Sequence, residues 1–180
     1  MDDVIGVDAS TVATGFAAGG PRDAVPRGGV WKLPGCDEIG GKFDITLKRT
    51  GQSIMELSKV LKPRAAYVEA PLDLIDRRHA AATAAALMQL AGAVRMAFAL
   101  VHVRVVLCAT HNVRKEFGVN PYLPSDEAKA AVQAKCDQLG WTYADDNEAD
   151  AKATWHYGMR QEYPGWRANA PLLFDAARSG

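Results

Sequence analysis

Acidic residues stand at three widely separated points of this 180-residue chain. Asp8 ends the apolar run of residues 4–8, Glu69 ends the run of residues 65–69, and Asp146 and Asp150 lie at the start of the last expected helix. An acid at the end of a buried strand is costly unless a partner offsets its charge. If folding gathers these carboxylates, a divalent cation would neutralise them, and all-oxygen ligands suit Mg²⁺ or Mn²⁺.

Each of these acids, taken singly, also has a purely structural explanation. Asp8 could form a turn with the backbone after its strand. Glu69 could form a salt bridge at a strand end. Asp146 could cap the last helix, and its neighbours Asp145 and Asn147 are equally good caps.

The composition bounds the class of protein. A chain of this length forms one domain with a sizeable core, and its 48% hydrophobic content is ordinary for a globular protein. Its 3 cysteines lack CxxC spacing, which fits a reduced cytoplasm and argues against a disulfide framework or a zinc site. The acidic start does not look like a signal peptide. The longest apolar stretch, residues 80–103, contains Arg95 and His102, so we expect a buried helix, not a membrane span.

The periodicity predicts a mixed sheet with helices on both faces. Three closely spaced strands should form an antiparallel meander, and later strands that alternate with helices should pair in parallel. The expected strands are 3–8, 15–18, 29–33, 65–69 and 103–108, and the expected helices are 43–61, 79–100, 112–117, 125–139 and 147–157. Ser125 is the expected N-cap of the fourth helix. The folded domain is expected over residues 1–160, followed by an irregular tail over 161–180.

This order of elements, with an acid at each point, resembles the ribonuclease H-like nucleases. Within them the chain is most similar to the RuvC family of Holliday-junction resolvases, especially the shorter, divergent forms carried by phages. The segments that carry the resemblance are 4–8 with Thr14-Gly15, 66–69, 90–95, 111–115 with 129–132, and 149–151. The ordered set makes a metal site the favoured explanation of the acids.

The resemblance implies a ribonuclease H-like α/β fold with a five-stranded mixed sheet. It implies two Mg²⁺ or Mn²⁺ ions per active site, held by Asp8, Glu69, Asp146 and Asp150, which hydrolyse a phosphodiester. It also implies a cytoplasmic homodimer that cleaves branched DNA such as Holliday junctions, and the apolar helix 79–100 is compatible with a dimer interface.

Basic residues near these segments are candidate phosphate contacts, although a solvated surface position is the commoner role of any one of them. They are Arg77 and Arg78 in the loop after Glu69, and Arg114, Lys115 and Lys129 further on.

The chain departs from the family in three features. The family's last two acids commonly stand three residues apart, but Asn147 lies three before Asp150, and Asp146 lies four before it. The loop 70–78 has no aromatic residue, and the net charge is zero, whereas DNA-binding proteins are usually basic.

Two other functions fit parts of the pattern. An actin-like or sugar-kinase-like ATPase also places an acid and a small turn after its first strand, but that fold needs two such domains, and this chain is too short for both. A non-catalytic DNA-binding relative of the resolvases would keep the fold without the metals, and the intact acids argue against it.

Overall fold

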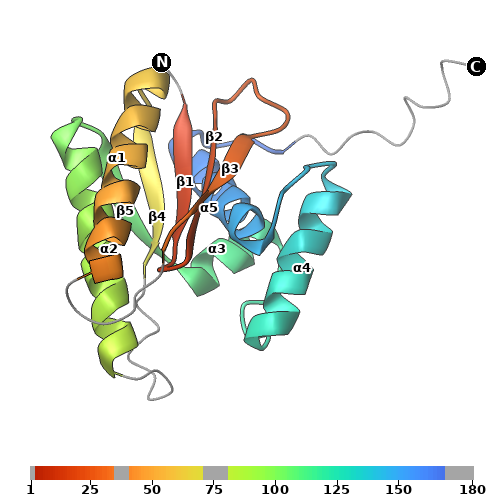
Figure 1. The fold of residues 1–180 in the computed structure, drawn as a ribbon. Coiled ribbons are helices and arrows are strands. Elements are labelled where there is room, and N and C mark those ends of the chain that lie inside the picture. The colour runs from red at the N-terminus through yellow and green to blue at the C-terminus, as the bar shows by residue number, and fades with distance from the viewer. Residues whose placement is uncertain (1–2, 35–40, 71–80, 169–180) are drawn as a thin grey trace, which may run out of the picture.

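The computed structural model describes residues 3–34, 41–70 and 81–168, which form a five-stranded sheet with helices on both faces (Figure 1). The strands run in the order β3-β2-β1-β4-β5 across the sheet. Their bounds are β1 Val4–Ala9, β2 Ala13–Gly19, β3 Arg27–Lys32, β4 Ala65–Ala70 and β5 Arg104–Ala109. The predicted fold class is therefore confirmed.

The sheet is mixed, as the sequence predicted. β1 pairs antiparallel with β2, and β2 with β3, through short connections. β4 pairs parallel with β1, and β5 pairs parallel with β4. The parallel pairs follow from the crossover helices α1, Phe43–Leu61, and α2, Ala81–Leu100, since a parallel strand needs a long return connection. The carboxyl ends of β1, β4 and β5 therefore meet at one edge of the sheet.

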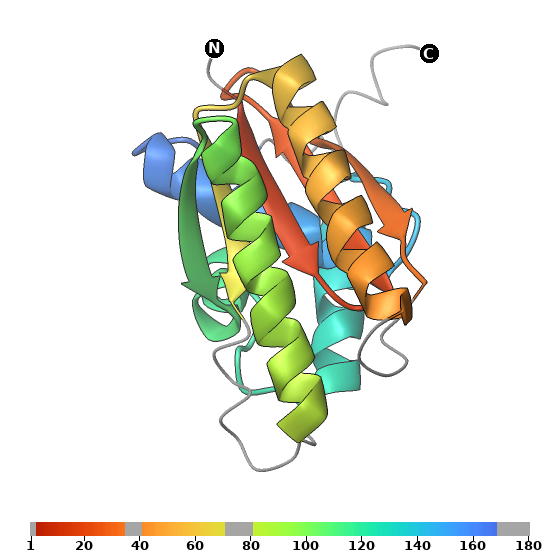
Figure 2. The same ribbon diagram turned by 60° about the vertical axis from the view of Figure 1, so that its left-hand side comes forward.

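The helices form two layers, which Figure 2 shows on opposite sides of the strands. α1 and α2 pack against each other on one face, over a core that includes Ile5, Val7 and Phe98. α5, Asp146–Glu162, crosses the other face against β1 and β2, with α3, Thr110–Phe117, and α4, Ser125–Gln138, packed beside it. This second core contains the buried Trp141 and Trp155.

Glycines let α5 lie directly on the sheet. A Cβ added at Gly6 would fall 2.2 Å from the backbone nitrogen of Trp155, and one at Gly15 would fall 1.9 Å from the carbonyl oxygen of Asn147. Real Cβ atoms essentially never approach so closely, so any side chain at these two positions would push the helix away. These glycines thus fix the height of the start of α5 above β1 and β2.

Several predicted boundaries were wrong by a few residues. Ser125 is the first residue of α4, and Pro124 precedes it without a side-chain cap. α5 begins at Asp146 and continues to Glu162, five residues beyond its predicted end. The extension holds because Glu162 accepts hydrogen bonds from Tyr67, Arg64 and Arg104 at the far end of the sheet.

α2 is the one described helix that is long and apolar enough to cross a membrane by length and composition, over Thr83–Leu100. It lies against α1 and on β1, β4 and β5 within the fold. Its outer side exposes Met88, Met96 and Leu100, which are 59%, 61% and 63% accessible. The sequence predicted a helix buried on most sides, in the core or in a dimer interface, and in the single chain this side is open.

Candidate active site at the carboxyl edge of the sheet

Asp8 and Glu69 lie side by side at the carboxyl ends of two neighbouring parallel strands. β1 and β4 pair in the register Val7↔Val68, and Asp8 and Glu69 are the next residues on each strand. Neighbouring strands are about 4.8 Å apart. Asp8 shares its face with Gly6, which touches α5, and Glu69 shares its face with Tyr67, whose ring also meets α5. Both carboxylates therefore project from the face that α5 covers.

The start of α5 brings the other two predicted acids to the same place. Asp145, not Asp146, caps the helix, because its carboxylate accepts a hydrogen bond of 3.1 Å from the backbone N–H of Glu148. Glu148 completes the cap by accepting from the backbone N–H of Ala144 at 3.0 Å. The capping role that the sequence left open for Asp146 thus falls to its neighbour, and Asp146 is available to the site.

Electrostatics shows that the four carboxylates share one environment. Burial raises the pKa of Asp8 well above its ordinary 3.8, and the charges of Glu69, Asp150 and Asp146 raise it further. Burial and the charge of Glu69 raise the pKa of Asp150 to about 7. Asp8 and Asp150 thus resist ionisation in one place, and a bound cation would stabilise their charged forms.

Two basic side chains partly offset this negative charge. Lys129 Nζ on α4 donates to Asp146 Oδ2 at 2.6 Å, and this bond lowers the pKa of Asp146 and raises that of Lys129. Lys129 also lowers the pKa of Asp8, and Arg114 on α3 lowers that of Asp150. The predicted phosphate contacts Lys129 and Arg114 therefore lie beside the acids.

Glu69 is oriented by a residue that the sequence did not single out. Thr110, the first residue of α3, donates its hydroxyl to Glu69 Oε1 at 2.5 Å. The parallel pairing of β4 and β5 makes this contact, because Thr110 follows β5 directly and Glu69 lies level with Cys108. The signal in the sequence that could have predicted this contact is a small polar residue directly after a parallel strand.

The donor set fits a hard divalent cation. All four candidate ligands offer carboxylate oxygens, which Mg²⁺ and Mn²⁺ prefer. As the side chains stand, no three His, Cys, Asp or Glu groups among the described residues are close enough to hold one ion. Lys129 holds Asp146 and Thr110 holds Glu69, and binding an ion would require side-chain shifts that bring the carboxylates closer together.

The remaining predicted residues fall elsewhere. Lys115 is exposed on α3, and Arg77 and Arg78 lie outside the described residues. Asn147, the alternative to Asp146, lies beside it with its amide nitrogen 3.4 Å from Asp146 Oδ1. The close approach at Gly15 was missed because it depends on packing, and the sequence left open which of Asp145, Asp146 and Asn147 caps the helix.

Comparison with known proteins adds evidence on the fold. No protein-family model matches the chain, and no curated protein matches it in sequence. Thermus thermophilus RuvC is similar in structure, with a TM-score of 0.62 and 17% identity over 91% of this chain and 97% of that one. The same protein in complex with a Holliday junction substrate has a TM-score of 0.66 and 19% identity, covering 96% of this chain and 100% of that one.

A third solved structure is also similar. The yeast mitochondrial Holliday junction resolvase Ydc2 has a TM-score of 0.60 and 9% identity over 88% of this chain and 79% of that one. At these identities the likeness is one of fold. The chain therefore has the fold of the RuvC-like Holliday junction resolvases, the group that its acidic pattern resembles.

Proposed function

We propose that the protein is a metal-dependent nuclease that cleaves branched DNA such as Holliday junctions. One observation carries the proposal: Asp8, Glu69 and Asp150 come from two adjacent strand ends and a crossing helix and share one electrostatic environment. The likeness to RuvC bound to a junction supports the choice of DNA as the substrate. The Mg²⁺ or Mn²⁺ requirement rests on the oxygen-only donor set.

The chain's own residues suit phosphodiester hydrolysis. Asp8, Glu69 and Asp150 would hold two divalent ions, with Asp146 as the fourth candidate, and the ions would activate water and stabilise the leaving oxygen. Thr110 keeps the Glu69 carboxylate in one orientation through its hydroxyl. Lys129 and Arg114 place positive charge beside the acids, where a DNA phosphate would otherwise be repelled.

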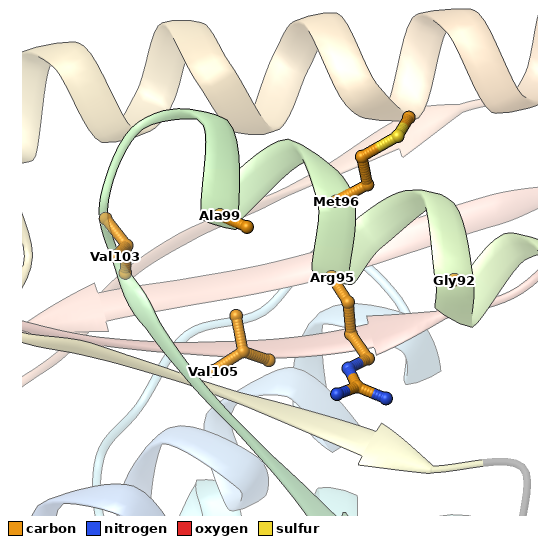
Figure 3. A pocket seen from close by; sticks show the side chains of 6 residues that line it. All are labelled: Gly92, Arg95, Met96, Ala99, Val103 and Val105. Carbon is orange, nitrogen blue, oxygen red and sulfur yellow. The ribbon is translucent and has the colours of Figure 1, made fainter.

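We propose further that two copies associate through the open side of α2. Met88, Met96 and Leu100 expose apolar surface there, and a cavity lies between this helix and the outer strand β5. Figure 3 shows Arg95 pointing from α2 toward the strands beside Val105, while Met96 points to the other side of the helix. Exposed apolar surface of this kind marks association, and two paired sites would nick a junction symmetrically.

The decisive experiment is cleavage of a synthetic four-way junction in Mg²⁺, with linear duplex of the same sequence as the control substrate. Asp8→Asn should reduce the cleavage rate by more than roughly a hundredfold, because the amide cannot replace a charged ligand. Glu56→Gln, on the exposed outer side of α1, is the matched control and should cleave normally. Normal nicking by Asp8→Asn would refute the metal site, and equal cutting of linear duplex would refute branch selectivity.

The same preparations separate the two rival functions. Hydrolysis of ATP without DNA cleavage would favour the actin-like or sugar-kinase-like reading. Tight junction binding by the wild-type protein, with no cleavage in Mg²⁺ or Mn²⁺, would identify a non-catalytic DNA-binding relative.

A further inference from the structure

A second polar cavity lies away from the acidic cluster, among the later turns of α3, α4 and α5. It has a volume of about 350 Å³, within the range of small-molecule sites. Its lining residues are Glu116, Phe117, Gly118, Lys135, Leu139, His156, Arg160, Arg167 and Ala168. His156 and Arg160 follow Asp150 by six and ten residues on α5, which places them about 9 and 15 Å further along the helix axis.

The cavity carries an excess of positive charge. Lys135, Arg160 and Arg167 face one acid, Glu116, which is already neutralised by Arg160 at 2.8 Å. Arg160 also donates to the carbonyl oxygen of Trp166 at 2.7 Å, so its guanidinium is held in place. Within the described residues, Lys135 and Arg167 have no hydrogen-bond or ion-pair partner. Two cations thus remain for an anionic ligand.

His156 lines the cavity with its aromatic ring. His156 Nδ1 is buried and forms no hydrogen bond in the described structure. Burial lowers the pKa of His156 to about 4, so the imidazole is neutral at pH 7 and presents an uncharged ring. Phe117 and Trp166 pack edge-on to the imidazole, with ring centroids 5.3 and 5.5 Å away.

We propose that this cavity binds one nucleotide unit, with its phosphate on Lys135 and Arg167 and its base or sugar against Phe117, Leu139 and His156. Cations alone would suit any anion, but the neutral imidazole and the apolar wall favour a ligand that also has an uncharged ring. The nucleotide could be free or could belong to a DNA strand, since both present the same phosphate and base. The site does not depend on the proposed nuclease activity.

The test measures binding in EDTA, so that cleavage plays no part. dAMP, deoxyadenosine, inorganic phosphate and a short 5′-phosphorylated single strand are titrated separately, and the fluorescence of the nearby Trp141 and Trp166 is followed. Lys135→Gln and Arg167→Gln should each weaken dAMP or single-strand binding roughly tenfold, as expected for a lost charged hydrogen bond. Lys59→Gln, exposed on α1 across the sheet, is the matched control and should bind as the wild type.

The titrations also identify the source of the nucleotide. Weakened binding of dAMP by the cavity variants indicates a free nucleotide, and weakened binding of the single strand alone indicates DNA. Deoxyadenosine should bind more weakly than dAMP. Inorganic phosphate that binds as tightly as dAMP would overturn the nucleotide assignment, and cavity variants that match Lys59→Gln with every probe would overturn the site itself.

Discussion

Replacing Asp150 by Asn should make the protein more stable while abolishing its activity. The Asp150 carboxylate is buried on the first turns of α5 beside Glu69, and its pKa is raised to about 7. A group whose folded pKa is raised above its unfolded value of 3.8 binds a proton more readily in the folded state. The loss of folding stability caused by ionising Asp150 is therefore absent below about pH 4, grows as pH rises, and is complete above about pH 7.

The size of the effect follows from the shift. A rise from 3.8 to about 7 corresponds to about 4 kcal/mol, which is an upper bound because the folded chain relaxes around the charge. For a protein of this size, each kcal/mol changes the melting temperature by roughly 2–4 °C. We therefore expect Asp150→Asn to melt several degrees higher than the wild type at pH 8 in EDTA, and nearly level with it at pH 4.

Thermal melts between pH 4 and pH 8, with and without Mg²⁺, test this reasoning. Mg²⁺ should raise the melting temperature of the wild type at pH 8 by binding the folded state, and should do so much less for Asp150→Asn. Glu56→Gln removes an exposed carboxylate from α1 and should follow the wild type throughout. An Asp150→Asn protein that melts lower than the wild type at pH 8 in EDTA would show that the carboxylates do not repel one another as argued.

Four further changes test the site and its supports. Gly15→Ala should move the start of α5 by more than 1 Å, because its Cβ would lie 1.9 Å from the carbonyl oxygen of Asn147. A shift of that size can lower the cleavage rate roughly a hundredfold. Gly51→Ala is the control and should leave the cleavage rate unchanged. Asp146→Asn should slow junction cleavage less than tenfold, because this acid is paired with Lys129. If it lowers the cleavage rate as much as Asp8→Asn does, Asp146 is a full metal ligand. Met96→Lys should sediment as a monomer at micromolar concentration and should keep the melting temperature of the wild type. A variant that sediments with the same mass as a dimeric wild type would rule out α2 as the interface. Glu162→Gln should lower the free energy of unfolding by about 1–3 kcal/mol at pH 7 and by less at pH 3, as followed by urea denaturation.

The sequence predicted those parts of the site that depend on strand ends. Asp8 and Glu69 each close an apolar run, and parallel pairing places such residues at one edge, so their proximity followed from the order of the elements. The role of Asp146 did not follow, because Asp145, Asp146 and Asn147 are all good caps and only the backbone geometry selects Asp145. The contact of Thr110 with Glu69 depends on strand register, which local sequence does not determine.

Packing produced the features that no local pattern could reveal. Lys152 and Glu148 form a buried ion pair of 3.0 Å beneath α5, although charged residues are rarely buried. The pair is tolerated because Glu148 also accepts from Ala144 and Lys152 donates to the carbonyl oxygen of Thr142, so neither charge lacks partners.

α5 explains how the fold tolerates a cluster of mutually repelling acids. At its start, Asp150 lies beside Asp8 and Glu69, and the repulsion there opposes folding. At its end, Glu162 is held by Tyr67 at 2.6 Å and by Arg64 at 2.9 Å. Burial opposes ionisation of Glu162, but these hydrogen bonds and those of Arg104 outweigh it and lower the pKa.

The two ends of the helix therefore depend on pH in opposite directions. The contribution of Glu162 is present above its unfolded pKa near 4.5 and is lost in acid, whereas the penalty at Asp150 is lost in acid and grows toward pH 7. Gly6 and Gly15 lack a Cβ and so let the helix lie close to the sheet. In the proposed metal site, a bound cation would neutralise these buried acids and remove the penalty at the start of the helix.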